Sequence, residues 1–305
     1  MVDYPLGGNE RRGIMSTSVK YRSAAVDSHN VFYREAGDPR APKILLFGGF
    51  PSSSHQWRDL IPALAFRGFH VVSPDYPGFG HTTSPDGFAF TFDNLSEVIE
   101  KWLIQIEFTS FGLYHQDYGG PIGNRIVARH PEWLQWQIVQ NSNAYEEGFT
   151  EAWDGIRFKL WKDRNTETED ALRPFLTTEG VKSIYLGGHP DPELISPDNW
   201  TVDVTFLELP GRREIQLDLL EDYKTNPPLY PAWQKALRDN RPPTIIFWGQ
   251  GDVFFTPAGG EAYLRDLPDA ELHRLNAGHF AVEDHVEYIA DNITRFFHER
   301  VEQSA

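Results

Sequence analysis

The sequence predicts an α/β fold: a mostly parallel, doubly wound sheet with an inserted, mainly helical lid. Short continuous apolar runs, such as residues 43–47 and 243–249, are typical of strands buried on both faces of a parallel sheet. Stretches with apolar residues at helical spacing, such as 95–106, separate these runs. The alternation breaks down only between about residues 143 and 241. This break indicates one sheet interrupted by an insertion of roughly a hundred residues.

Length, charge and composition limit the classes of protein to consider. The 305 residues suffice for one large α/β domain or for a core plus an inserted lid. A net charge of −16 argues against nucleic acid or an anionic membrane as a partner. The absence of cysteine excludes disulfides, thiolate metal sites and a cysteine nucleophile. No apolar run reaches membrane-spanning length and the N-terminus lacks a signal-peptide pattern, so we expect a cytoplasmic protein.

The first half of the chain alternates strands and helices after a polar arm over residues 1–18. Asp27 and Ser28 join two of the strands and give a hairpin signal. We expect strands at residues 19–26, 30–35, 43–47 and 70–73, and helices at 55–66 and around 95–106.

The second half resumes this alternation beyond the break. We expect strands at residues 136–140, 243–249 and 271–275, and helices at 257–267 and 286–297. Within the break, residues 150–163 and 167–176 have helix-like patterns among many Pro, Asp and Asn residues. The prediction is therefore an α/β core of residues 1–144 and 241–305, with residues 145–240 as a lid. Such a lid would cover the carboxyl ends of the strands, where ligands bind in sheets of this kind.

The rest of the chain is organised around residues 111–120. A short apolar run stops at a polar pair, Asp117 follows, and Gly119 and Gly120 precede a helical stretch. This order predicts a strand, a tight turn and a helix, in which the middle side chain stands above the sheet as a nucleophile elbow. The alternative is that Asp117 is an ordinary turn residue, because Asp-x-Gly is common in turns.

An aspartate at this position favours a two-step reaction. A carboxylate with a pKa near 4 is already ionised at neutral pH, so it can attack without a base. Attack on a tetrahedral carbon that carries a leaving group gives a covalent ester between the substrate and Asp117. Water must then attack the carbonyl carbon of that ester, and this second step requires a base and an oxyanion hole.

His279 and Asp252 are the predicted base and its orienting acid. Each follows its own predicted strand, and a parallel sheet brings the ends of its strands to one edge. Taken singly, His279 reads as a solvated loop histidine and Asp252 as a turn residue. The order nucleophile, acid, histidine is the order of the α/β-hydrolase triad, which favours the catalytic interpretation of all three. The backbone N–H groups of Tyr118 and Phe50 are the expected oxyanion hole.

At these residues the chain resembles α/β-hydrolases of the epoxide hydrolase and haloalkane dehalogenase group, which act through an aspartate nucleophile. The resemblance covers residues 20–145 and 240–300 and implies nucleophile, acid and base roles for Asp117, Asp252 and His279. The segments that carry it are Gly49-Phe50-Pro51, Ser54, Trp57, Ile61-Pro62-Ala63-Leu64, Gly68, Asp75, Gly78-Phe79-Gly80, the elbow and Gly278-His279-Phe280.

Two positions depart from the pattern of that group. Gly48 stands where the family usually has histidine, and His115 stands where a small residue is usual. Neither change removes a catalytic group, but both are expected to reshape the floor of the pocket.

The resemblance leaves the leaving group open. Dehalogenases of this group bind halide with a tryptophan after the nucleophile or an asparagine in the Gly-x-Pro loop, whereas this chain has Tyr118 and Phe50, without a side-chain N–H. Epoxide hydrolases use two lid tyrosines. Tyr223 matches the second of these, while the first falls near Phe158, which cannot donate. Tyr185 is a candidate replacement, with Tyr145 and Tyr230 as further possibilities.

The resemblance therefore implies a hydrolase that opens an epoxide to a diol through an ester on Asp117. The first alternative is a haloalkane dehalogenase, and the second is a non-hydrolytic ligand-binding or biosynthetic accessory protein of the same fold. We expect no cofactor and no metal. The expected partners are a small apolar organic substrate and water, and the oligomeric state stays open.

Overall fold

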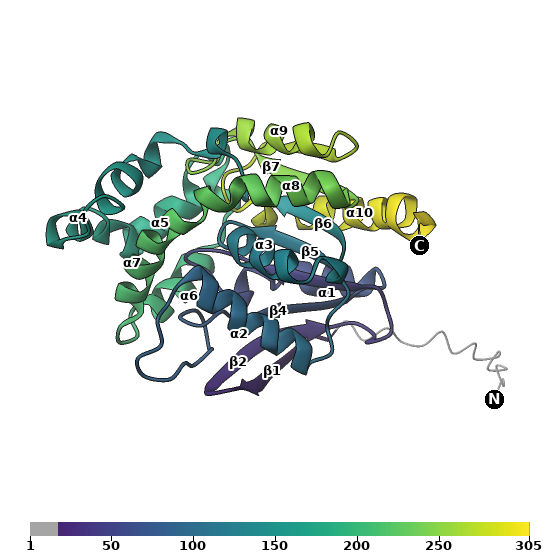
Figure 1. Ribbon diagram of the computed structural model, residues 1–305, viewed down its shortest axis with the longest axis horizontal. Helices are drawn as coiled ribbons and strands as arrows, with labels where there is room; N and C mark the ends of the chain where they lie inside the picture. The colour runs from purple at the N-terminus through teal and green to yellow at the C-terminus, as the bar shows by residue number, and fades with distance from the viewer. Residues whose placement is uncertain (1–17, 305) are drawn as a thin grey trace, which may run out of the picture.

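An eight-stranded sheet forms the centre of the computed structural model, which describes residues 18–304 (Figure 1). The polar arm expected over residues 1–18 lies outside the described residues except for its last one. In spatial order the strands run β1-β2-β4-β3-β5-β6-β7-β8. Their bounds are β1 Lys20–Val26, β2 His29–Ala36, β3 Lys43–Phe47, β4 His70–Pro74, β5 Phe111–Gln116, β6 Leu134–Gln140, β7 Thr244–Gly249 and β8 Glu271–Leu275.

The predicted mostly parallel sheet is confirmed. β1 and β2 form an antiparallel hairpin at one edge, and β2 also pairs antiparallel with β4. All remaining neighbours pair in parallel, from β4 through to β8. The carboxyl ends of β3, β5, β7 and β8 therefore meet at one edge of the sheet.

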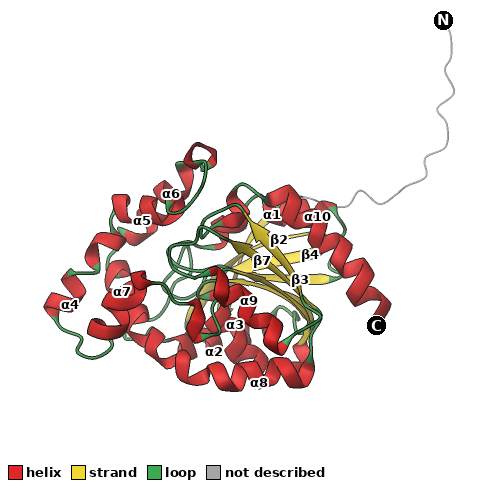
Figure 2. Cartoon of the chain, turned by 90° about the horizontal axis from the view of Figure 1, so that it is seen from above, coloured by secondary structure: helices red, strands yellow, loops and turns green. Residues whose placement is uncertain are grey.

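Helices cover both faces of the sheet, as a doubly wound fold requires (Figure 2). The helices α1 and α10 pack together on one face. The other face carries α2, α3, α8 and α9. Their bounds are α1 Leu60–Phe66, α2 Phe92–Gln105, α3 Gly119–Arg129, α8 Tyr230–Asn240, α9 Pro257–Asp266 and α10 Val286–Phe296.

Helix α2 shows how the sequence pattern becomes a packed element. Thr91 caps its N-terminus, because the Thr91 hydroxyl accepts a hydrogen bond from the backbone N–H of Asn94. The apolar residues at helical spacing, among them Leu95, Ile99 and Trp102, are fully buried against the sheet. The stripe read from the sequence is therefore a core face.

The helix expected over residues 55–66 is shorter than predicted. Residues Ser54–Trp57 form a separate 3₁₀ turn, and the α-helix begins only at Leu60. Pro62 explains the break, because it has no N–H to bond the carbonyl four residues earlier and is tolerated only in a helix's first turn.

The inserted segment (residues 145–240) lies between β6 and β7, which are nevertheless direct neighbours in the sheet. All of its residues are described, and none belongs to a strand of the main sheet. Helices α4 to α7 gather at one end of the sheet (Figure 1). Their bounds are α4 Thr166–Asp170, α5 Thr178–Leu186, α6 Asp198–Leu207 and α7 Arg212–Asp222.

The helix-like pieces expected at residues 150–163 and 167–176 are mostly single turns. A 3₁₀ turn at Glu151–Trp153 and a π-helical turn at Ile156–Leu160 replace a long first helix. Helix α8, at the end of the inserted segment, packs beside α3 and α9 and so belongs spatially to the layer on the sheet. The division into a core of residues 1–144 and 241–305 and a lid of residues 145–240 stays a prediction.

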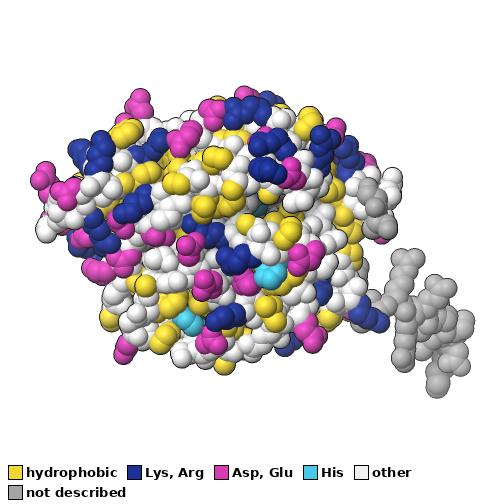
Figure 3. All heavy atoms as spheres, in the orientation of Figure 1, with side chains coloured by type: hydrophobic (Ala, Val, Ile, Leu, Met, Phe, Trp, Pro, Cys, Tyr) yellow, Lys and Arg dark blue, Asp and Glu magenta, His cyan; other side chains and the backbone are white. Residues whose placement is uncertain are grey.

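Charge and hydropathy are distributed as in a protein with a solvated surface. On the face in Figure 3, acidic and basic side chains lie interspersed and do not gather into one patch. Among residues 18–304, no helix combines the length and the hydropathy needed to cross a bilayer.

Candidate active site

Asp117 lies in a strained turn directly after β5. Its φ angle is +49°, in the left-handed region that a residue other than glycine occupies at a cost of roughly 1–3 kcal/mol. The backbone N–H of Asp117 donates to the carbonyl of Asn141 at 3.2 Å, and helix α3 begins two residues later. Neighbouring glycines make this turn possible: a Cβ atom on Gly49 would lie 2.2 Å from Asp117 Oδ1, and one on Gly119 would lie 2.3 Å from the Phe47 carbonyl oxygen. The predicted strand, turn and helix are thus present.

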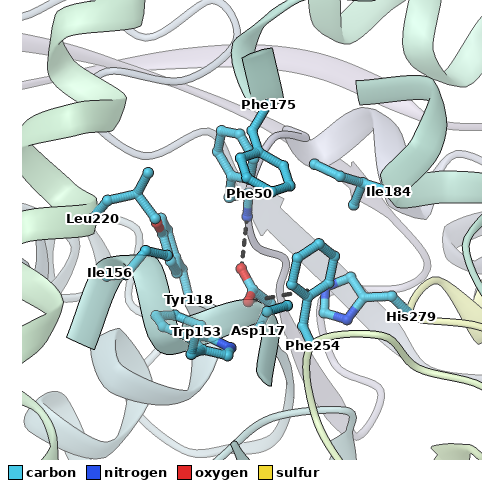
Figure 4. Close-up of a pocket in the computed structure, with 11 residues that line it drawn as sticks. Phe50, Asp117, Tyr118, Trp153, Ile156, Phe175, Ile184, Leu220, Phe254 and His279 are labelled. Carbon is cyan, nitrogen blue, oxygen red and sulfur yellow. Dashed lines mark hydrogen bonds and ion pairs between the residues drawn. The ribbon is translucent and has the colours of Figure 1, made fainter. Parts of the chain in front are cut away.

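The carboxylate of Asp117 receives backbone hydrogen bonds. The N–H of Phe50 donates to Asp117 Oδ1 at 2.8 Å (Figure 4). Burial raises the pKa of Asp117, while His279 and the N–H groups of Phe50 and Tyr118 oppose that rise because they favour the charged form. The two N–H groups predicted for an oxyanion hole therefore both act on this carboxylate.

His279 lies between two aspartates. Its Nδ1 is 2.8 Å from Asp252 Oδ2, and its Nε2 is 3.9 Å from Asp117 Oδ2. Burial lowers the pKa of His279, but the charge and hydrogen bond of Asp252, together with the charge of Asp117, outweigh burial and raise it. The structure thus brings the three predicted triad residues together, with the side chains buried.

Asn141, which sequence reasoning missed, orients Asp252. Its side-chain amide donates to Asp252 Oδ2 at 2.8 Å, and its Oδ1 accepts from the N–H of Gly249 at 2.8 Å. The other carboxylate oxygen of Asp252 accepts from the N–H of Phe254 at 2.7 Å. The sequence could have indicated Asn141, because it is a polar residue directly after the buried strand β6. Asp252 was identified in a similar way, as a polar residue after β7.

A pocket opens above Asp117 and His279 (Figure 4). Apart from these two, its lining is apolar or aromatic and comes from both parts of the chain: Phe50, Tyr118 and Phe254 from the predicted core, and Ala152, Trp153, Ile156, Phe175, Ile184 and Leu220 from the inserted segment. Such a lining suits a small apolar molecule.

Two polar atoms of the pocket-lining residues have no hydrogen-bond partner among residues 18–304. They are the indole nitrogen of Trp153 and the hydroxyl of Tyr118, and both are buried. In Figure 4 the edge of the Trp153 ring that carries this nitrogen is turned toward Asp117. A buried donor without a partner costs free energy, so both groups are candidates to bind a substrate atom. Sequence reasoning missed Trp153.

The candidate lid tyrosines differ in their surroundings. The Tyr223 hydroxyl is buried and faces the Tyr230 hydroxyl, and the Tyr223 ring lies 4.6 Å from the Trp153 ring and 5.9 Å from the Tyr118 ring, centroid to centroid. The Tyr185 hydroxyl instead donates to Asp203 Oδ2 at 2.6 Å.

Neither Tyr223 nor Tyr185 lines the pocket itself. The other two tyrosines considered are Tyr145, whose hydroxyl donates to Asp266 at 2.7 Å, and Tyr230, whose hydroxyl faces that of Tyr223.

His115, one of the two departures from the family pattern, lies behind the elbow. Its Nδ1 hydrogen-bonds with the Ser142 hydroxyl at 2.9 Å, and burial lowers its pKa to about 4. His115 is therefore neutral at physiological pH and adds no charge to the site. In the part of the chain that the structure describes, no three His, Asp or Glu side chains are grouped to hold a metal ion.

Comparison with known proteins places this geometry in context. Residues 42–286 match the alpha/beta hydrolase fold family. The chain is 40% identical over 276 residues to an uncharacterized hydrolase of Saccharomyces cerevisiae, covering 90% of this chain and 95% of that protein. It is 34% identical over 264 residues to haloalkane dehalogenase 2 of Mycobacterium tuberculosis, covering 84% of this chain and 88% of that protein.

A solved structure of similar fold is haloalkane dehalogenase DbeA from Bradyrhizobium elkani. The TM-score is 0.70 at 20% identity, over 94% of this chain and all of that one (100%). At this identity the likeness shows the fold alone.

Proposed function

The chain belongs to the alpha/beta hydrolase family and is a hydrolase, and from this premise we propose that it acts through a covalent alkyl ester on Asp117. The observation behind the proposal is that the two carboxylate oxygens of Asp117 have different surroundings. Oδ1 is held by the Phe50 N–H at 2.8 Å, whereas Oδ2 lies toward His279 Nε2 at 3.9 Å. Oδ1 is thus placed to become the ester carbonyl oxygen, and Oδ2 is free to attack.

In the first step, Asp117 Oδ2 attacks a tetrahedral carbon of the substrate, and the bond to the leaving group breaks. No proton has to be removed from the nucleophile, because the carboxylate is the attacking form. The backbone donors of Phe50 and Tyr118 favour that charged form against the effect of burial. His279 is not required for this step.

In the second step, His279 Nε2 takes a proton from water, and the water oxygen attacks the Asp117 carbonyl carbon. Negative charge then develops on Oδ1, where the N–H groups of Phe50 and Tyr118 stabilise it. The bond between that carbon and Oδ2 breaks, the product leaves with Oδ2, and the imidazolium returns the proton to it. The second proton of the water then leaves the Asp117 carboxyl, which restores the carboxylate. Asp252 stabilises the imidazolium through the 2.8 Å contact at Nδ1.

The favoured substrate is an epoxide with an apolar body. Opening an epoxide leaves an alkoxide, which needs a donor that can supply a hydrogen bond and then a proton. Tyrosine hydroxyls meet this need, and two buried ones lie near Asp117: Tyr118 in the pocket wall and Tyr223, which faces Tyr230, behind it. Tyr185 is engaged with Asp203 and is not part of this proposal.

A haloalkane is the second candidate substrate, and Trp153 is the observation that favours it. A departing halide needs hydrogen-bond donors but no proton. Tyr118 and Phe50, beside Asp117, have no side-chain N–H that could bind a halide. The inserted segment, however, brings the indole N–H of Trp153 to the pocket. The haloalkane dehalogenase name of a relative at 34% identity points the same way.

Single-turnover alkylation of matched variants separates the two substrates. With styrene oxide as the probe, Tyr223→Phe should slow ester formation by roughly ten- to a thousandfold while Trp153→Phe changes it little. With butyl bromide as the probe, the order of the two variants should reverse.

The substrate class is the one on which the wild type forms the ester, and the slowed variant identifies its leaving-group donor. Failure of both probes, and of a wider set of epoxides and alkyl halides, to label Asp117 in a His279→Gln background would favour the accessory-protein alternative.

A further inference from the structure

The two ring nitrogens of His279 have different partners. Nδ1 faces the Asp252 carboxylate at 2.8 Å, whereas Nε2 lies 2.8 Å from the side-chain amide nitrogen of Gln116. Gln116 directly precedes Asp117 and is completely buried, with 0% of its surface exposed. Gln116 in turn is held by Gln56, whose amide nitrogen donates to Gln116 Oε1 at 3.3 Å.

These contacts fix where the His279 proton lies. The Asp252 carboxylate can only accept, so Nδ1 carries the hydrogen. Gln116 Oε1 accepts from the Gln56 amide, and in this orientation the Gln116 NH₂ group faces His279 Nε2. An NH₂ group can only donate, and Nε2 must therefore present its lone pair. This is the neutral form that a general base requires.

We propose that Gln116 is a positioning residue, which donates a hydrogen bond to His279 Nε2 and so holds this nitrogen unprotonated between turnovers. This proposal rests on the role of His279 as the base in the proposed function. The reacting water needs the same lone pair, so Gln116 releases it in the hydrolysis step.

The charges around His279 explain why such a donor is useful. The charged groups that face His279 are Asp252 and Asp117, and both favour the imidazolium. An imidazolium cannot accept a proton from water. A hydrogen bond donated to the neutral ring opposes the two aspartates, because it stabilises the unprotonated form.

Gly48 gives this arrangement its room. A Cβ atom on Gly48 would lie 2.5 Å from Gln56 Oε1 and 3.3 Å from the indole nitrogen of Trp57. Gln56 therefore occupies space that a side chain at position 48 would need. The departure noted in the sequence, glycine in place of histidine, is what admits the Gln56–Gln116 pair.

The test is a titration of His279 in the free enzyme, followed by the NMR shifts of its imidazole nitrogens. The His279→Gln protein assigns the signal. Gln116→Met keeps the length of the side chain but cannot donate, so the midpoint should rise by roughly one pH unit, as expected for one lost hydrogen bond to the neutral form. Gln116→Glu places an acceptor at Nε2 and should raise the midpoint further.

Gln137→Met is the matched control, because Gln137 is a buried glutamine on β6 that donates to the Thr244 hydroxyl at 3.0 Å. It should leave the His279 midpoint unchanged. Gly48→Ala should displace the flexible end of Gln56 and raise the midpoint by less than Gln116→Met does. This variant tests the same contact should Gln116→Met fail to fold.

Unaltered His279 midpoints and nitrogen shifts in folded Gln116→Glu and Gly48→Ala proteins would overturn the proposal and leave Gln116 a packing residue. The readout needs no substrate. It therefore stands apart from the proposed function, which would fail instead if no ester formed on Asp117.

Discussion

The edge of the sheet and the inserted segment contribute to the pocket in different ways. Asp117, Asp252 and His279 each follow a strand of one parallel ladder, so backbone hydrogen bonds fix their spacing. The inserted segment lines the same pocket with side chains such as Trp153 and Ile156, presented by single turns of 3₁₀ and π helix. The sheet therefore positions the proposed reacting groups, while the inserted segment shapes the pocket above them and supplies candidate leaving-group donors.

The two regions are joined next to His279, the proposed base. Glu283, which follows His279 in the same loop, receives Arg58 at 2.6 Å and Asn199 of helix α6 at 2.8 Å. Close by, the Tyr185 ring of the inserted segment stacks on Phe280 at 4.2 Å. A change in how the inserted segment docks would therefore reach the base directly.

Among changes to residues at the edge of the sheet, removal of the proposed nucleophile should have the largest effect on turnover. Asp117→Ala leaves no carboxylate to form the ester, so turnover should fall by roughly 10⁴- to 10⁶-fold. Mass spectrometry of the intact protein after mixing with substrate should find no adduct. Stability should not fall, because a strained buried charge is removed. An adduct elsewhere on the chain would contradict the assignment of Asp117.

His279→Gln should separate the two steps. Attack by Asp117 continues because it needs no base, whereas the ester persists because no group activates water. The ester adduct, which Asp117→Ala cannot form, should therefore accumulate in His279→Gln and be detectable by mass spectrometry.

In the wild type, single turnover in heavy-oxygen water should place the label in the Asp117 carboxylate. Label found only in the product would mean that the enzyme activates water directly and forms no ester.

The pH dependence of ester hydrolysis follows from the raised pKa of His279. The base must be neutral, so the rate constant should rise with pH through a midpoint above the ordinary histidine value of about 6.5. Asp252→Asn removes the charge that raises the pKa and should move the midpoint down. Rapid-quench measurements of the ester-hydrolysis rate constant at a series of pH values test this dependence. A midpoint below about 6.5 would contradict the effect of Asp252 and Asp117 on His279.

Breaking the buried ion pair of Glu283, which also holds Asn199 of the inserted segment, should destabilise the fold. Arg58→Ala leaves the Glu283 carboxylate, whose side chain is only 3% exposed, without its bidentate partner. Loss of one partner of such a pair costs roughly 3–5 kcal/mol of unfolding free energy. Denaturant unfolding measures the loss. The double variant Arg58→Met with Glu283→Gln should recover part of it, because no unpaired charge then remains.

A pH-dependent effect is expected from Asp203 in helix α6. Burial raises its pKa to about 7, well above the ordinary value of 3.8, so the folded state holds a proton that the unfolded chain releases. Stability should therefore fall as pH rises from about 4 to about 7 and then level off, at about 1.4 kcal/mol per pH unit at most. Asp203→Asn does not titrate, and its unfolding free energy should lack this component. If the unfolding free energies of the wild type and of Asp203→Asn changed with pH in the same way, the raised pKa of Asp203 would be contradicted.

Much of the molecule follows from local sequence. The apolar runs set the strands, the Asp-x-Gly turn set the elbow, and a parallel sheet then brings the residues after its strands to one edge. Asp117, Asp252 and His279 could be placed in this way because their positions depend on the backbone. The order of residues along the chain was sufficient to predict them as a group.

The partners of the side chains were decided only by the tertiary structure. Gln116 meets His279 across 163 positions of sequence, and Trp153 reaches the pocket from a single turn with no periodic pattern. Tyr185, the candidate replacement for the first lid tyrosine, turns its hydroxyl to Asp203 instead. The physical reason is that an apolar pattern determines which face of an element is buried, whereas the contacts of one buried polar atom depend on how distant segments pack around it.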